Sequence, residues 1–131
     1  MSDLAWPIIL NDGEWPEGSA LLQWTQFMDE AFTKMGRRAD CARLYKDQLV
    51  AAGFVNVVEK RFIWPTNSWP KDKKLKELGM WCREDFQMGL EAMSMGLFTR
   101  VLGWTSLDVE VFIVKAKNEF NDPRIHAYYE V

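Results

Sequence analysis

Residues 53–64 read GFVNVVEKRFIW and give the clearest indication of the fold. Gly53 closes a preceding helical pattern, and the β-branched and aromatic residues that follow predict a strand over 54–64. A helix that passes through a glycine directly into a strand is typical of α/β proteins. We therefore predict a helix-rich α/β fold.

Apolar residues at three- and four-residue spacing predict helices over 19–35, 41–52, 71–102 and 106–120. In the third helix, Gly79 could interrupt the helical pattern, so the sequence is compatible with one continuous helix or with a break there. The second half of this helix bears apolar residues on so many sides that it needs cover from more than one direction. In the second helix four residues are expected to face inward, namely Leu44, Tyr45, Leu49 and Ala52.

The two ends of the chain are predicted to differ. Residues 1–18 combine Trp-Pro pairs with an Asp-Gly turn, so we expect an irregular, acidic arm there. Residues 125–131 are predicted to form a second strand. Two strands cannot make a well-shielded sheet, because both faces and both edges need cover. Either strands from elsewhere complete the sheet, or the chain dimerises with a copy of itself, and we expect dimerisation.

The amino-acid composition excludes several classes of function. The chain has 131 residues, 48% apolar and 27% charged, which fits one globular domain. A net charge of −3 argues against a nucleic-acid partner, which needs a basic face. The apolar runs are too short to cross a membrane, and no secretory signal is evident. With two cysteines and one histidine, neither a disulfide framework nor a metal site is predicted, and a cytoplasmic location is expected.

Several separate segments carry a resemblance to one family. They are Glu17–Trp24, Lys34–Arg37, Ala51–Val57, Trp64-Pro65, Trp69–Asp72, Lys76–Gly79, Phe98–Trp104 and His126–Tyr128. In this order they resemble fungal class I methyltransferases of the LaeA-like group, which use S-adenosylmethionine. The resemblance runs from about residue 10 to the end and covers only the C-terminal part of such an enzyme. It implies the C-terminal part of a Rossmann-like fold, in which residues 65–102 are inserted helices that cover the substrate.

The resemblance also indicates what the chain lacks. In this family the methyl donor is bound in the N-terminal half, where a glycine-rich turn follows a strand, as in dinucleotide-binding folds. No Gly-x-Gly spacing occurs in this sequence. We therefore predict a single, truncated methyltransferase-like domain over 1–131 that binds no cofactor by itself.

Two sets of candidate site residues emerge. His126, with a side chain that ordinarily titrates near neutral pH, is the natural acid/base group, and Tyr128 would face the same side of a strand. A structural role for a single histidine remains the alternative. Flat aromatic rings and adaptable thioethers suit a hydrophobic, polyketide- or terpenoid-like substrate, although the same residues also build ordinary cores. This substrate set comprises Trp64, Trp69, Trp81, Met88, Met93, Met95 and Trp104.

Two classes of function follow. The first is a cofactor-independent enzyme of fungal secondary metabolism, derived from a methyltransferase, that folds a hydrophobic substrate and catalyses isomerisation, cyclisation or dehydration with His126 and Tyr128. The alternative is a non-catalytic module, either a pseudo-methyltransferase or a part of a methyltransferase completed by a partner. The expected partners are a hydrophobic small molecule and either a second copy or a methyltransferase.

Overall fold

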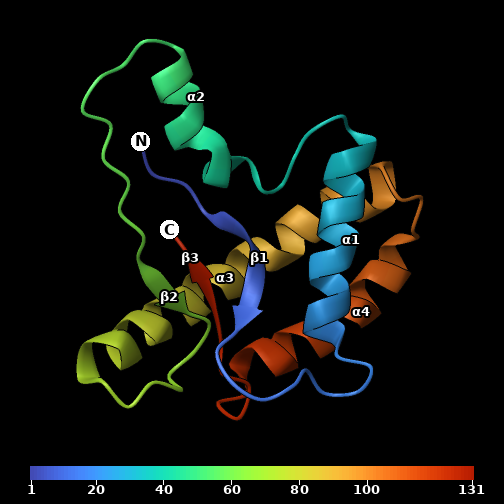
Figure 1. Ribbon diagram of the computed structural model, residues 1–131. Coiled ribbons are helices and arrows are strands. Elements are labelled where there is room, and N and C mark those ends of the chain that lie inside the picture. The colour runs from blue at the N-terminus through green and yellow to red at the C-terminus, as the bar shows by residue number, and fades with distance from the viewer.

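The computed structural model describes all residues, 1–131, and shows four helices around a small sheet (Figure 1). This confirms the helix-rich α/β class. The strands are β1 (Ala5–Leu10), β2 (Ile63–Pro65) and β3 (Ala127–Glu130). The helices are α1 (Ala20–Lys34), α2 (Tyr45–Ala51), α3 (Lys73–Arg100) and α4 (Ser106–Asn121), and a 3-10 turn, η1 (Cys41–Leu44), leads into α2.

The sheet is antiparallel, with the order β1-β3-β2, so the last strand lies between the other two. The prediction that residues 1–18 are an irregular arm was therefore wrong for β1. Ala5 pairs with Glu130 and Leu10 with Ala127, and a bulge separates the two ends of the ladder. Pairing with a strand more than a hundred residues away is a tertiary effect, which the local Trp-Pro and Asp-Gly signals do not reveal.

The strand predicted over 54–64 is mostly absent. Only Ile63 and Trp64 lie in β2, and residues 54–62 form no strand. The β-type composition of this segment needs a partner, and its neighbour β3 ends opposite Phe62, where Phe62 and Val131 exchange two backbone hydrogen bonds of 2.8 and 2.9 Å. Without a strand beyond that pair, strand propensity alone does not form a ladder.

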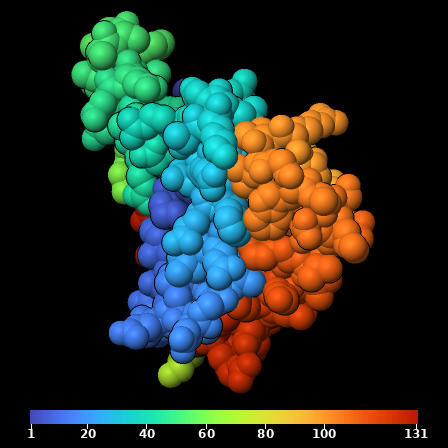
Figure 2. Space-filling model, turned by 90° about the vertical axis from the view of Figure 1, so that its right-hand side faces the viewer, coloured from blue at the N-terminus to red at the C-terminus, as the bar shows by residue number.

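One hydrophobic core lies where α1, α3 and α4 pack together and cover the sheet. Figure 2 shows α1 lying against α4 and the C-terminal end of α3. Trp24 of α1 is fully buried, and its indole N–H donates to Ser94 Oγ of α3 at 2.8 Å. The largest fully buried apolar side chains are Trp24, Phe98, Phe120, Leu21, Met28, Leu90 and Val109. No helix is long and apolar enough to cross a membrane.

One helix prediction needs correction, and the open question at Gly79 is answered. The predicted helix 41–52 divides into η1 and the short α2, and Leu44, Tyr45, Leu49 and Ala52 are not buried. The reason is that α2 projects from the body of the molecule, at the top left of Figure 2, while η1 contacts the edge strand β1, so neither part reaches the core. Helix α3 runs without interruption through Gly79, and the absence of a side chain there lets the helix approach the carbonyl oxygen of Asn67 closely.

A carboxylate of α4 caps α1. Glu119 accepts hydrogen bonds from the Ser19 hydroxyl at 2.5 Å and from the backbone N–H groups of Ala20 and Leu21 at 2.9 and 3.0 Å. The first amides of a helix have no partner within the helix, and a negative charge there is favourable. Glu119 thus holds α1 to α4.

We expect Glu119→Gln to lower the free energy of unfolding by about 1–2 kcal/mol, because the charge-assisted hydrogen bonds become neutral and an NH2 group, which can only donate, replaces one of the two accepting carboxylate oxygens. Urea denaturation measures this loss. Glu110→Gln, on the exposed side of the same helix, is the matched control and should change little. Equal stability of the two variants would contradict the capping role.

Candidate functional site

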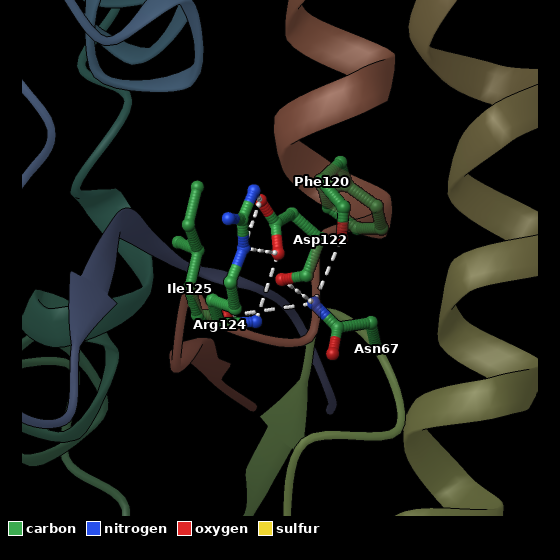
Figure 3. Close-up of polar contacts among 5 residues, drawn as sticks. All are labelled: Asn67, Phe120, Asp122, Arg124 and Ile125. Atoms are coloured by element: carbon green, nitrogen blue, oxygen red, sulfur yellow. Dashed lines mark hydrogen bonds and ion pairs between the residues drawn. The ribbon is translucent and has the colours of Figure 1, made fainter.

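Beside β3, the loop after β2 meets the segment that joins α4 to β3, and Asn67 ties the two together (Figure 3). This side chain is 1% exposed, and its amide N–H₂ donates to the carbonyl oxygens of Phe120 and Asp122 at 2.9 and 3.1 Å. Its amide oxygen accepts from the backbone N–H of Trp69 at 3.0 Å. Asn67 therefore fixes the end of α4, the turn before β3 and the loop after β2 in one arrangement.

Arg124 reinforces the turn that Asn67 holds. Its guanidinium donates to both carboxylate oxygens of Asp122, at 2.7–3.2 Å, and its backbone N–H donates to the same carboxylate at 2.9 Å. The side-chain hydrogen bond from Arg124 lowers the pKa of Asp122 to about 2.

We expect the Asp122 carboxyl to titrate near pH 2 instead of the ordinary 3.8. Because the pKa is lowered in the folded state, the contribution of this pair to stability is present above pH 4 and is lost as the pH falls through about 2. Carbon-13 NMR of the carboxyl group measures the midpoint. Arg124→Gln should return it toward the ordinary value, and a midpoint near 4 in the unmodified protein would contradict the contact.

His126 lies in this loop cluster with two partners. Its Nδ1 lies 2.8 Å from Asp12 Oδ1, in the turn that follows β1. Its ring stacks on Trp69, with ring centroids 4.9 Å apart and an interplanar angle of 18°. The Trp69 indole N–H donates to the Ala127 carbonyl at 2.8 Å. A carboxylate on Nδ1 orients an imidazole and makes Nε2 the nitrogen that can exchange a proton with a bound molecule.

Tyr128 lies two residues beyond His126, on the side of β3 away from the helical core. Ala127 and Tyr129 alternate with it and are buried in the core, whereas Tyr128 is half-buried opposite Ile9. His126 thus lies directly before β3, and Tyr128 lies within it. Their catalytic role stays a prediction.

The seven predicted substrate-binding residues do not lie together. Trp69 is in the loop cluster, and Trp64 is in β2 opposite Tyr129. Trp104 packs in the core on Phe27, with ring centroids 4.8 Å apart, and Met95 packs against the same core. The other three are exposed on α3, namely Trp81, Met88 and Met93. A helix of 28 residues places its side chains on every side and along its whole length, so a shared pocket does not result.

Two buried titratable groups near the sheet stay protonated and unreactive at neutral pH. Burial raises the pKa of the Cys82 thiol to about 11, so this cysteine stays protonated at neutral pH. Burial also raises the pKa of Tyr129, which is 4% exposed and has no hydrogen-bond partner at its hydroxyl. Neither group is poised as a nucleophile.

Three residues that shape this region were not predictable from the sequence. Asp12 belongs to the Asn-Asp-Gly turn and gave no sign of meeting His126, 114 positions away. Asn67 stands in the loop after β2 and meets Phe120, 53 positions away. Trp6 is on the core side of β1, with its ring centroid 5.5 Å from that of Trp24. No local signal distinguishes these residues from other polar or aromatic ones.

Comparison with known proteins shows which kind of protein this chain is similar to. The homologues of this chain are fungal methyltransferases and LaeA-like regulators of secondary metabolism, as the resemblance predicted. No family model matches, and no solved structure matches.

Three relatives show the extent of the similarity. The probable methyltransferase tdiE of Emericella nidulans is 36% identical over the whole chain, which covers 41% of that protein. Methyltransferase pytC of Aspergillus terreus is 37% identical over 91% of the chain and 37% of its own length. The secondary metabolism regulator LAE1 of Cochliobolus heterostrophus is 29% identical over 88% of the chain and 38% of its own length. The chain thus spans about 40% of these relatives, an extent that fits the predicted C-terminal part.

Proposed function

We propose that this chain is the helical, substrate-covering part of a methyltransferase-type protein, and that the polypeptide that holds the methyl donor adjoins β1. The main support is that the layer of helices is much larger than the sheet it covers. Helices of 15, 28 and 16 residues pack on a sheet of three short strands, in which β1 has a strand partner on one side only. A strand edge of this kind is a template for further pairing.

The side chains of β1 support the same proposal. Trp6 packs on Trp24, yet its buried indole N–H has no hydrogen-bond partner. A buried donor without an acceptor costs about 1–3 kcal/mol. An acceptor on the adjoining polypeptide, or on a substrate held between the two parts, would remove this cost.

The test is to mix the chain with a separate polypeptide containing the part of the Emericella nidulans relative that the chain does not match. Sedimentation velocity should detect a one-to-one complex. Trp6→Phe keeps an aromatic ring but removes the N–H, so it should weaken the complex, whereas Trp81→Phe, at an exposed position, should not. The proposal fails if the two polypeptides sediment independently, or if the chain forms only a dimer with itself.

A second candidate function is a cofactor-independent acid/base enzyme of secondary metabolism. It is favoured by one specific arrangement, the contact of His126 with Asp12 and its stacking on Trp69. In this proposal Nε2 of His126 transfers a proton during an isomerisation, cyclisation or dehydration, and Tyr128 is the second acid/base group. A hydrophobic substrate would lie against Trp69, on which His126 stacks.

This second proposal is tested with polyketide- and terpenoid-like intermediates of the biosynthetic pathway. Removal of an acid/base group typically lowers a rate by about 10²–10⁴-fold, which is the loss expected for His126→Ala. Asp12→Asn should give a smaller loss, since it disturbs the orientation of the ring. An unchanged product profile when the protein is omitted would rule out this function.

A further inference from the structure

The turn after β1 contains the dipeptide Asp12-Gly13, which has a specific covalent chemistry. The backbone nitrogen of the residue after an aspartate can attack the side-chain carbonyl carbon of that aspartate and close a five-membered imide ring. Glycine favours this reaction, because it has no side chain to shield its nitrogen. No other aspartate in the chain precedes a glycine. This turn is therefore the position at which the chemistry is expected.

The fold itself requires glycine at position 13. Gly13 has a φ of +72°, in the left-handed region that residues with a side chain rarely adopt. Just before it, the Asn11 N–H donates to the His126 carbonyl oxygen at 2.8 Å, so the turn lies beside the segment that leads into β3 (Figure 1). The conformation of the turn thus keeps an unshielded nitrogen next to Asp12.

The attacking nitrogen is free and accessible to water. The Gly13 N–H donates no hydrogen bond to another backbone group, and a Cβ built on Gly13 would meet no atom within 4 Å. Residues 11–14 are all exposed. Asp12 and Gly13 also border a cavity of about 530 Å³, which gives water a route to the ring. Neither a helix nor a sheet therefore holds this peptide bond away from the reaction.

His126 restrains the side chain that would react. Its Nδ1 lies 2.8 Å from Asp12 Oδ1, and its ring is held in turn by stacking on Trp69. Ring closure turns the Asp12 Cγ toward the Gly13 nitrogen and expels one carboxyl oxygen, so the present contact with His126 is lost. One hydrogen bond of ordinary strength corresponds to a factor of about two to ten in a rate.

We propose that Asp12-Gly13 is a site of isoaspartate formation and that the contact with His126 slows this modification. The Gly13 nitrogen bonds to Asp12 Cγ, and one Cγ–O bond breaks. The oxygen leaves as water, with the proton of the Gly13 N–H and the carboxyl proton. Water then opens the ring: addition at Cγ restores aspartate, whereas addition at the Asp12 backbone carbonyl carbon gives isoaspartate. The sum of the two steps adds and removes no atoms.

The modification would separate the turn from His126. In isoaspartate the chain runs through Cβ and Cγ of residue 12, which lengthens the backbone by one methylene group. The free carboxylate is then attached to Cα and no longer lies at His126 Nδ1. The β1–β3 ladder ends at the pair of Leu10 and Ala127, outside the modified bond, so we expect the sheet to persist.

The test incubates the full, folded chain at neutral pH, below its unfolding temperature, and follows its proteolytic peptides by chromatography and mass spectrometry. The peptide that contains Asp12-Gly13 should divide into two isomers of equal mass, with a transient form lighter by one water. Electron-transfer fragmentation assigns the isoaspartate to position 12. Asp29 and Asp108, which lie in α1 and α4, are internal controls and should remain unmodified.

Two substitutions at position 12 test the ring closure. Asp12→Glu keeps a carboxylate but requires a six-membered ring, so it should form little isomer. Asp12→Asn releases ammonia instead of water, which is a better leaving group than the carboxyl oxygen, so it should form the same imide faster than the unmodified chain.

His126→Phe tests the restraint. Phenylalanine keeps an aromatic ring for Trp69 but removes the nitrogen that contacts Asp12, so isoaspartate should accumulate about two- to tenfold faster. Circular dichroism verifies that this variant is folded. An independent measurement needs no variant: during incubation of the unmodified chain, the NMR signals of the His126 ring should divide into two sets whose ratio follows the isomer ratio.

Two results would overturn the proposal. The first is the absence of isoaspartate at position 12 in the folded chain, especially if the chain unfolded in urea forms it, since the folded turn would then hold the Gly13 nitrogen out of reach. The second is equal or slower conversion in His126→Phe, which would mean that the contact with His126 does not restrain the Asp12 carboxyl group.

Discussion

Gly79→Ala should lower the free energy of unfolding by at least about 3 kcal/mol, the upper range for overpacking a tight contact. A Cβ atom at this position would lie 2.0 Å from the Asn67 carbonyl oxygen and 2.7 Å from its carbonyl carbon. These are backbone atoms of Asn67, which joins the loop after β2 to the end of α4, so a shift of these atoms would disturb the Asn67 hydrogen bonds. Urea denaturation measures the loss, and NMR should show that the resonances of His126 shift.

The matched control is Gly89→Ala in the same helix. No atom lies within 4 Å of a Cβ built there, and alanine favours helix over glycine by about 1 kcal/mol. Gly89→Ala should therefore be neutral or stabilising. If both variants lose the same stability, the close approach of α3 to Asn67 is not the cause.

Trp24→Ala is expected to cost about 3–5 kcal/mol, the range for truncating a large buried aromatic residue. Trp24 is 0% exposed and contacts Trp6 and Phe86, and its loss also leaves the buried Ser94 hydroxyl without the Trp24 donor. Because Trp24 joins α1 to α3 and to β1, its loss should disturb the whole core. Thermal unfolding followed by circular dichroism measures this effect.

Trp81→Ala is the control for Trp24. The Trp81 side chain is 69% exposed, so its truncation should change stability by less than about 0.5 kcal/mol. A large loss for Trp81→Ala would mean that Trp81 is covered in solution, which would point to self-association through α3.

Local patterns predicted the long helices well. Leu21, Trp24 and Met28 recur on one face of α1, and all three are fully buried. Thr105 caps α4 from directly before the helix, where its hydroxyl accepts from the Asp108 N–H at 3.1 Å. These features depend on residues within a turn or two of one another, so the sequence contains them directly.

Pairing between distant segments was not predictable in the same way. β1 exists because Ala5 and Leu10 meet β3 at the other end of the chain, and residues 54–62 lack a ladder because β3 ends beside Phe62. The contacts of the candidate site were likewise not predictable from local sequence. His126 was identified by its chemistry, but Asp12 and Trp69 become its partners only when three loops converge. Likewise, nothing in a tryptophan's own neighbourhood separates buried Trp24 from exposed Trp81.

Titration calorimetry with S-adenosylmethionine tests the account most directly. We expect no measurable heat of binding with the chain alone, and binding once the chain is mixed with the unmatched part of the Emericella nidulans relative. Micromolar binding of S-adenosylmethionine by the isolated chain would contradict the account, because a donor site would then be built from these 131 residues.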